Sequence, residues 1–86
     1  SFAISEITPN PFNPVASFSV MIPNKGNLSV SVIDITGRTI SNIFNGEADY
    51  GVHSLKWNGE NYPSGVYYIR CSFNGEKIVK RALLMK

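Results

Sequence analysis

Apolar and polar residues alternate along most of the 86-residue chain, which is the period of a strand with one buried face. The alternation runs over residues 16–22 and 28–32, and it is strongest in VYYIRCSF at 66–73. Pro23 ends the first of these runs, because proline cannot donate a hydrogen bond to a ladder. No window has the apolar spacing of a helix. The chain is therefore predicted to be all-β.

Turn residues divide the rest of the chain into short strands. The sequence DITGR at 34–38 supplies an aspartate for turn capping and a glycine for positive φ, which predicts a hairpin. Asn45-Gly46 predicts a further turn, and Asn74-Gly75 predicts a two-residue type I′ hairpin. The predicted strands cover residues 2–7, 16–22, 28–32, 40–44, 51–57, 66–73 and 76–85. Their number and spacing are typical of an immunoglobulin-like antiparallel β-sandwich, so residues 1–86 are predicted to form one seven-stranded domain.

The sequence NPFNP at 10–14 is predicted to be a structural corner. Each proline removes a backbone donor and moves the preceding asparagine out of the α region, so the segment cannot continue a paired strand. It is expected to break the ladder between the first two strands. Phe12 is expected to fold back and close one end of a thin core, since a chain of this length buries only roughly 60 to 65% of its surface.

Position within the alternation separates buried from exposed side chains. Trp57 and Tyr67 are in phase with core residues. Tyr67 lies near the start of its strand and is predicted to form a tyrosine corner, in which the hydroxyl bonds upstream backbone. Cys71 is predicted to point inward as a small apolar group. The rings left as exposed candidates for weak glycan binding are Tyr50, Tyr62 and Tyr68.

The chain has one histidine and one cysteine, which is a poor inventory for catalysis. A hydrolytic site needs a nucleophile, a base and an orienting group, but Cys71 is expected inside the core and His53 at its rim. A zinc site needs three or four soft ligands. The acids Asp34, Glu47 and Asp49 lie in or near turns without the dense spacing of a calcium loop, which favours turn capping. We therefore expect no enzyme activity, no metal and no cofactor.

The formal net charge of +2 is too small to indicate a nucleic-acid or membrane surface. The positive charge gathers at the end of the chain, where Glu76 accompanies the basic residues Lys77, Lys80, Arg81 and Lys86. Such a cluster is typical of an edge strand, because lysines there discourage pairing between sheets. The apolar run at 82–85 predicts that the last strand is buried on both faces or bulged. No apolar run approaches the roughly 20 residues of a transmembrane helix.

Six sequence elements occur together in a characteristic order. They are NPFNP, VASFSVMIP, LSVSVIDITGR, GVHSLKWNG, PSGVYYIR and the terminal KRALLMK. In this order they resemble the C-terminal sorting domains of the type IX secretion system, and equally the related immunoglobulin-like domain of the flagellar hook-capping protein. The resemblance covers nearly the whole chain. It implies a sandwich at the C-terminus of a larger exported bacterial protein, recognised by the outer-membrane translocon and often removed after passage.

The resemblance also points to particular residues. In the family the final strand and its terminal basic residue matter to recognition, which here implicates Lys80, Arg81, Leu83, Leu84 and Lys86. The family's glycine and aromatic residue at the last turn correspond to Gly65 and Tyr67. The chain departs from the family pattern at Ala82, where a larger apolar residue is usual, and at Cys71, where leucine is common.

These observations predict a non-catalytic sorting and anchoring module of a secreted or cell-surface protein from a Gram-negative bacterium. Its expected partners are the outer-membrane secretion machinery and a cargo or catalytic domain on its N-terminal side. Because nothing at the N-terminus resembles a signal peptide, an export leader is expected outside this chain. The alternative is an accessory immunoglobulin-like domain beside the catalytic domain of a secreted enzyme, acting as a spacer, an assembly module or a weak glycan-binding module.

Overall fold

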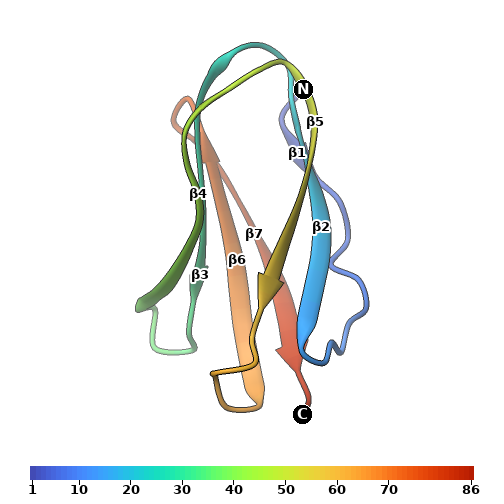
Figure 1. The fold of residues 1–86 in the computed structure, drawn as a ribbon. Helices are drawn as coiled ribbons and strands as arrows, with labels where there is room; N and C mark the ends of the chain where they lie inside the picture. The colour runs from blue at the N-terminus through green and yellow to red at the C-terminus, as the bar shows by residue number, and fades with distance from the viewer.

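The computed structural model describes all 86 residues and contains seven β-strands and no helix. The strands form two antiparallel sheets that lie face to face (Figure 1). The three-stranded sheet has the order β1-β2-β5, and the four-stranded sheet has the order β4-β3-β6-β7. The bounds are Ala3–Ile4 for β1, Val15–Ile22 for β2, Gly26–Ile33 for β3, Thr39–Ala48 for β4, Gly51–Asn58 for β5, Gly65–Phe73 for β6 and Glu76–Leu84 for β7. The predicted seven-stranded sandwich is confirmed.

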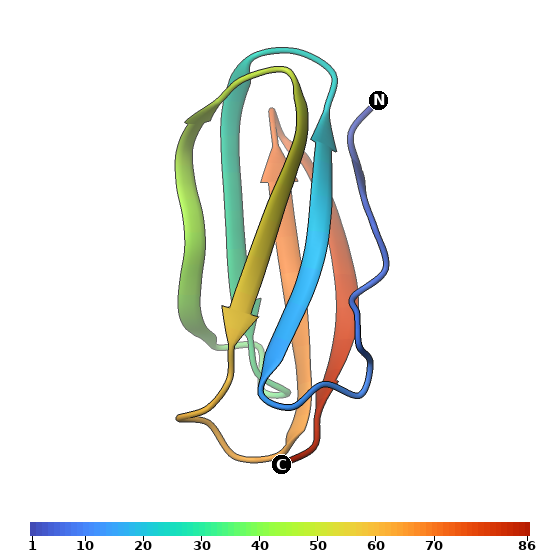
Figure 2. The ribbon, with the colours of Figure 1, turned by 45° about the vertical axis from the view of Figure 1, so that its right-hand side comes forward.

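The strand order is that of an immunoglobulin-like sandwich with one rearrangement. In a constant-type immunoglobulin domain, the fourth strand lies in the same sheet as the first, second and fifth. Here β4 pairs with β3 in the other sheet. The connection from β4 to β5 therefore crosses from one sheet to the other, as Figure 2 shows at the top of the molecule. The register with β3 shifts at two places, where Ile43 and Ile40 of β4 have no partner, and these extra residues mark bulges in β4.

The inward side chains of both sheets form one apolar core, because alternate residues of a strand point to the same face. In β2 and β6 the alternation is regular from end to end. The inward residues of these two strands are Ala16, Phe18, Val20, Ile22, Tyr67, Ile69, Cys71 and Phe73. Cys71 is fully buried, as predicted. Burial of a large apolar side chain such as Val, Leu, Ile or Phe contributes about 1.5 to 3 kcal/mol to folding.

Two of the predicted turns are observed. Asn74 and Gly75 both have positive φ, 48° and 84°, which is the conformation of a type I′ hairpin. The turn at 34–38 joins β3 to β4, and Gly37 adopts a φ of 89° that favours glycine. Each turn sets the register of the strands that it connects.

The predicted turn at Asn45-Gly46 is wrong. Gly46 lies inside β4 with Leu28 as its partner on β3, and the chain reverses later, at Asp49 and Tyr50. The pairing with β3 continues to Ala48, so tertiary contacts override a local turn signal. The predicted N-terminal strand is also shorter than expected, because only Ala3–Ile4 pairs continuously with β2.

The prediction that the last strand is bulged or buried on both faces is also wrong. β7 pairs with β6 over its whole length without a register shift. Ala82 and Leu84 are fully buried, Leu83 is half-buried on the other face, and Met85 lies beyond the strand with 55% of its surface exposed. The apolar run therefore reflects the end of a strand, with one buried face.

Candidate functional site

β7 is the last strand of the four-stranded sheet, so one side of its backbone faces away from β6 (Figure 1). The backbone N–H and C=O of Leu83 bond to residues of the N-terminal segment rather than to β6. Hydrogen-bonding direction alternates along an antiparallel strand, and the register of β6 with β7 has no shift. The backbone groups of Lys77, Val79 and Arg81 therefore point outward at the same edge.

The N-terminal segment covers the half of this edge that lies nearest the C-terminus. Phe12 donates its N–H to the carbonyl of Leu83 (2.9 Å) and accepts the N–H of Met85 (3.0 Å), which makes a short parallel bridge. The side chain of Asn10 extends this pairing: Oδ1 accepts the N–H of Leu83 (3.0 Å), and Nδ2 donates to the carbonyl of Arg81 (3.2 Å). The NPFNP segment, predicted to break the ladder, does interrupt the pairing of the N-terminal segment with β2. It pairs instead with the β7 edge of the other sheet.

The ring of Phe12 lies behind this bridge and is 1% exposed. Its centroid is 5.7 Å from that of Trp57, with 59° between the ring planes. Gly59 packs closely against this end of the core, because a Cβ at that position would lie only 3.0 Å from Leu84 and 3.4 Å from the Phe12 ring. The predictions that Phe12 closes one end of the core and that Trp57 is buried are confirmed.

The other half of the β7 edge has no partner within the chain. The N–H and C=O of Lys77 and Val79, and the N–H of Arg81, bond to no other residue. The side chains of these three residues are exposed, and 51% of Val79 is accessible. The edge strand expected from the C-terminal charge is thus observed, with one covered half and one open half.

Lys80 points the other way, toward the space between the sheets. Its neighbours in the alternation are the half-buried Ile78 and the buried Ala82. Its ammonium reaches the Oε2 of Glu6, 3.4 Å away on the N-terminal segment, and its side chain is 33% exposed. An inward-pointing lysine on an edge strand disfavours edge-to-edge pairing of sheets. The ion pair joins β7 to the segment that follows β1.

Lys86 is held against the loop between β5 and β6. Its ammonium donates to the carbonyls of Glu60 (2.6 Å) and Tyr62 (3.0 Å). Its backbone N–H donates to Oγ of Ser64 (3.0 Å). The basic residue that the resemblance implicates in recognition is therefore also a structural contact to the β5–β6 loop.

The remaining residues implicated by the resemblance differ in accessibility. Arg81 is exposed and Leu83 is half-buried on the outer face, whereas Leu84 is fully buried. A partner that binds the folded domain can contact Arg81 and Leu83, but it cannot contact Leu84 without opening the core. Ala82, where the family has a larger residue, is fully buried opposite Tyr67, so the small side chain accommodates a ring.

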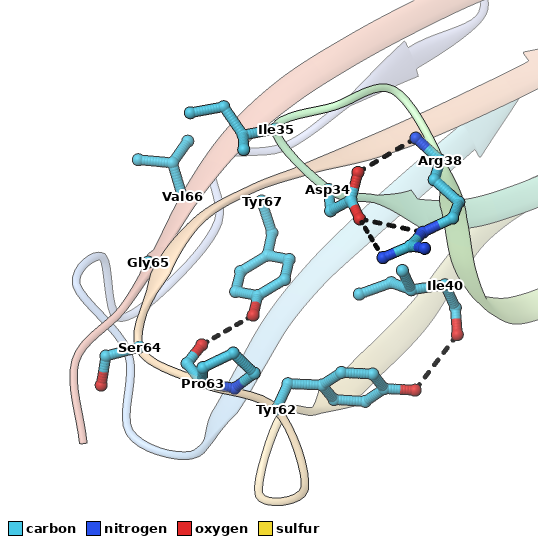
Figure 3. Close-up of a pocket in the computed structure, with 10 residues that line it drawn as sticks. All are labelled: Asp34, Ile35, Arg38, Ile40, Tyr62, Pro63, Ser64, Gly65, Val66 and Tyr67. Carbon is cyan, nitrogen blue, oxygen red and sulfur yellow. Dashed lines mark hydrogen bonds and ion pairs between the residues drawn. The ribbon is translucent and has the colours of Figure 1, made fainter.

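A pocket of about 450 Å³ lies between the β3–β4 turn and the start of β6 (Figure 3). Tyr67 donates its hydroxyl to the carbonyl of Pro63 (2.6 Å), which confirms the tyrosine corner. Tyr62 donates its hydroxyl to the carbonyl of Ile40 (3.1 Å), so this ring, predicted to be exposed, is half-buried and packs against the core. Gly65 lines the pocket with a φ of 154°, a conformation that side chains rarely adopt. Since both hydroxyls are bonded within the chain, the pocket offers mainly apolar surface.

The tyrosines considered for glycan binding do not converge on one surface. Tyr50 is 69% exposed in the β4–β5 connection, and Tyr62 belongs to the β5–β6 loop. These two connections lie at opposite ends of the sandwich (Figure 1). Tyr68 is half-buried on the outer face of β6, opposite Arg81. No pair of these rings forms a platform for a sugar.

Asp34 organises the turn that borders the pocket, as Figure 3 shows. Its Oδ1 accepts hydrogen bonds from the hydroxyl of Thr36 (2.6 Å) and from the backbone N–H of Thr36 and Arg38 (3.0 Å each). The Arg38 guanidinium lies 3.3 Å from Oδ2. These contacts, with the Thr36 hydroxyl first, lower the pKa of Asp34 to about 2. The prediction that this acid caps a turn is confirmed.

The histidine and the cysteine lie on different sheets. Cys71 is on β6, and burial raises the pKa of its thiol to about 11, which disfavours the nucleophilic thiolate. His53 is half-buried on β5 and donates from Nε2 to the carbonyl of Asp49 (2.7 Å). The structure brings together no three side chains of the types that bind metals.

Asn10 is the residue of this site that sequence reasoning missed. Its two partners lie 71 and 73 positions away in the chain, and no local pattern reports such a contact. The open half of the β7 edge, in contrast, could be predicted from the sequence. A two-residue hairpin at Asn74-Gly75 fixes the register of the last two strands, and the register determines which backbone groups face outward.

Comparisons with known proteins give a family and a fold. The family model described as a secretion system C-terminal sorting domain matches residues 6–85. No curated protein matches the chain. A solved structure of Pseudomonas fluorescens alkylpurine DNA glycosylase AlkC, bound to DNA containing an abasic site analog, is similar with a TM-score of 0.50 and 16% identity. That alignment covers 99% of this chain and 30% of the glycosylase, and at this identity it shows the fold alone.

The family assignment agrees with the architecture described above. The matched region includes β2 to β7 and the NPFNP segment. No helix of the structure has the length and apolar composition needed to cross a membrane. The chain belongs to the family of C-terminal sorting domains of the type IX secretion system, which interact with the secretion machinery and mark a secreted or cell-surface protein for export through the outer membrane.

Proposed function

We propose that this chain is the non-catalytic C-terminal module of a larger exported protein, which it directs through the type IX translocon by presenting the edge strand β7. The observation that carries the proposal is the concentration of positive charge on one edge strand, where Lys77, Lys80 and Arg81 lie within five positions. A cargo or catalytic domain precedes Ser1 in the same polypeptide.

The five residues implicated in recognition divide into two groups under this proposal. Arg81, Lys80 and Leu83 form the contact surface, since each has accessible side-chain area on or beside the β7 edge. Leu84 and Lys86 act from within the fold: the first is buried in the core, and the second fastens the end of the chain to the β5–β6 loop. The signal is therefore a folded surface rather than a linear tail.

The absence of catalysis is part of the same proposal. It is supported by the buried thiol of Cys71, by its raised pKa, and by the position of His53 on the other sheet. The sugar-binding alternative has little support, because Tyr50, Tyr62 and Tyr68 lie on separate surfaces.

The proposal is tested by fusing residues 1–86 to a fluorescent reporter that carries a periplasmic export leader, in a host with a type IX system. The measured quantity is the fraction of reporter outside the cell. We expect most of the folded fusion outside. Retention in the periplasm, with the domain shown to be folded by protease resistance, would contradict a sorting function and favour an accessory structural domain.

A matched pair of charge variants tests the contact surface. Arg81→Gln removes an exposed cation from β7, and Lys56→Gln removes an exposed cation from β5 in the other sheet. Both changes are at exposed positions, where substitutions usually alter stability by less than about 0.5 kcal/mol. We expect Arg81→Gln to lower the exported fraction and Lys56→Gln to leave it unchanged. Equal export of both variants would show that β7 is not the recognised edge.

A further inference from the structure

From the open half of the β7 edge, we infer that the secretion machinery reads this domain by β-strand addition. An extended segment of the partner, with the pattern acid, any residue, apolar, any residue, acid, pairs with residues 77–81. This inference rests on the proposed function and names the chemistry of the partner at the same site.

The backbone of β7 supplies the pairing groups. The N–H and C=O of Lys77 and Val79 and the N–H of Arg81 face outward without a partner. They span about 14 Å, the length of a five-residue strand. Beyond Arg81 the edge is occupied by Asn10 and Phe12, so an added strand ends there. Main-chain bonds of this kind provide affinity in β-strand addition, and the side chains provide specificity.

The side chains beside these groups define the partner. Lys77 and Arg81 flank the exposed Val79, and all three lie on the outer face of the sheet. The adjacent strand adds Arg70 opposite Val79, and the outer faces of β6 and β7 carry no acidic residue. Directly opposed unlike charges stabilise a strand pair, so an added strand fits best with acids opposite Lys77 and Arg81 and an apolar residue opposite Val79. The pattern is symmetric and holds for either strand direction.

The same charges disfavour the other obvious occupant of the edge, a second copy of this chain. Antiparallel pairing of two β7 edges centred on Val79 would place Lys77 of one copy opposite Arg81 of the other. Like charges directly opposite each other destabilise a pair, and the inward Lys80 is a further device against edge-to-edge pairing. The edge is thus repulsive toward itself and attractive toward an acidic strand, which is how specificity against a competitor is achieved.

The pairing is tested in solution with the 86-residue chain and a synthetic peptide, Thr-Glu-Thr-Val-Thr-Glu-Thr. A control peptide has lysine in place of both glutamates. Amide NMR shifts measure the affinity and locate the site. We expect the acidic peptide to shift the amides of Lys77, Val79 and Arg81 and to bind about tenfold more tightly than the lysine peptide. Equal binding of the two peptides, or shifts confined to the pocket between the β3–β4 turn and the start of β6, would overturn the inference.

Two kinds of variant separate backbone from charge. Val79→Pro removes an outward N–H and leaves the hydrogen bonds to β6 intact, whereas the matched Val79→Ala keeps that N–H. We expect the proline variant alone to lose binding. The double variant Lys77→Glu and Arg81→Glu changes no backbone group, so it remains informative if the proline variant does not fold. Its preference should reverse to the lysine peptide, and an unchanged preference would overturn the inference.

The same variants in the reporter fusion distinguish this inference from the proposed function. If the wild-type fusion is not exported, the proposed function fails. If the wild-type, Val79→Ala and Val79→Pro fusions are exported equally, sorting stands and strand addition at this edge is wrong. Loss of export with Val79→Pro but not with Val79→Ala supports the inference. An oligomer of the wild-type chain held through β7, seen by light scattering and abolished by Val79→Pro, would assign the edge to a second copy instead.

Discussion

Replacing Phe12 with alanine should remove a large part of the stability of this domain. The ring is 1% exposed and fills the end of the core between Trp57, Gly59 and Leu84. The substitution leaves the two backbone hydrogen bonds of Phe12 to β7 in place, since they involve its N–H and C=O only. What is lost is the buried ring and its packing, and Gly59 has no side chain with which to fill the space.

The expected loss in the free energy of unfolding follows from the burial of the Phe12 ring. Truncation of a buried phenylalanine to alanine costs about 3 to 5 kcal/mol, because the lost transfer energy is added to the cost of the cavity. An ordinary domain of this length has a free energy of unfolding of about 4 to 13 kcal/mol. The variant is therefore expected to lose about a quarter or more of its free energy of unfolding. A graded variant, Phe12→Leu, keeps most of the apolar volume and should lose about 1 to 2 kcal/mol.

The assay is urea unfolding, followed by Trp57 fluorescence and by far-ultraviolet circular dichroism. The second signal is needed because Trp57 is a direct neighbour of the substituted ring. Tyr50→Ala is the matched control, since it truncates an aromatic ring that is 69% exposed, and it should change stability by less than about 0.5 kcal/mol. A loss below about 1 kcal/mol for Phe12→Ala would refute the assignment of Phe12 as the plug of the core.

Three further predictions concern single groups. Because the pKa of Asp34 is lowered to about 2, its contribution to stability is complete above about pH 4 and is lost as the pH falls toward 2. Urea unfolding between pH 5 and 2 should therefore show a smaller acid loss for Asp34→Asn than for the wild type, and parallel curves would contradict this. The thiol of Cys71 is buried, and its pKa is raised to about 11. It should therefore react with a disulfide reagent at pH 8 only after the chain is unfolded in urea. Fast labelling of the folded chain would be inconsistent with its burial. Lys86→Met removes two hydrogen bonds to the carbonyls of Glu60 and Tyr62. It should lower the free energy of unfolding by about 1 kcal/mol and speed amide exchange in residues 59–64. Unchanged exchange would show that the contact does not order the loop.

Features that depend on neighbouring residues were predictable from the sequence. The Asn74-Gly75 hairpin follows from the need for two residues of positive φ, and the inward position of Cys71 follows from a period of two. Tyr67 and its bond to Pro63 also lie within one short stretch of chain. In each case the residues that decide the structure are close in the sequence.

Features that depend on distant partners were not predictable in the same way. Asn45-Gly46 has the composition of a turn, but pairing with β3 holds Gly46 in a strand. The place of Tyr62 in a loop predicts an exposed ring. Its contacts with Ile40, which is 22 positions away, and with the core depend on the tertiary fold and leave no local signal. The role of Asn10 on the β7 edge was hidden for the same reason.

The central claim is that the folded domain is an export signal read by the type IX machinery. It is tested most directly by comparing the extracellular fraction of the reporter fused to residues 1–86 in two otherwise identical strains, one with the type IX translocon and one without it. The folded fusion is expected outside the cell in the first strain and in the periplasm in the second. The same distribution in both strains would contradict it.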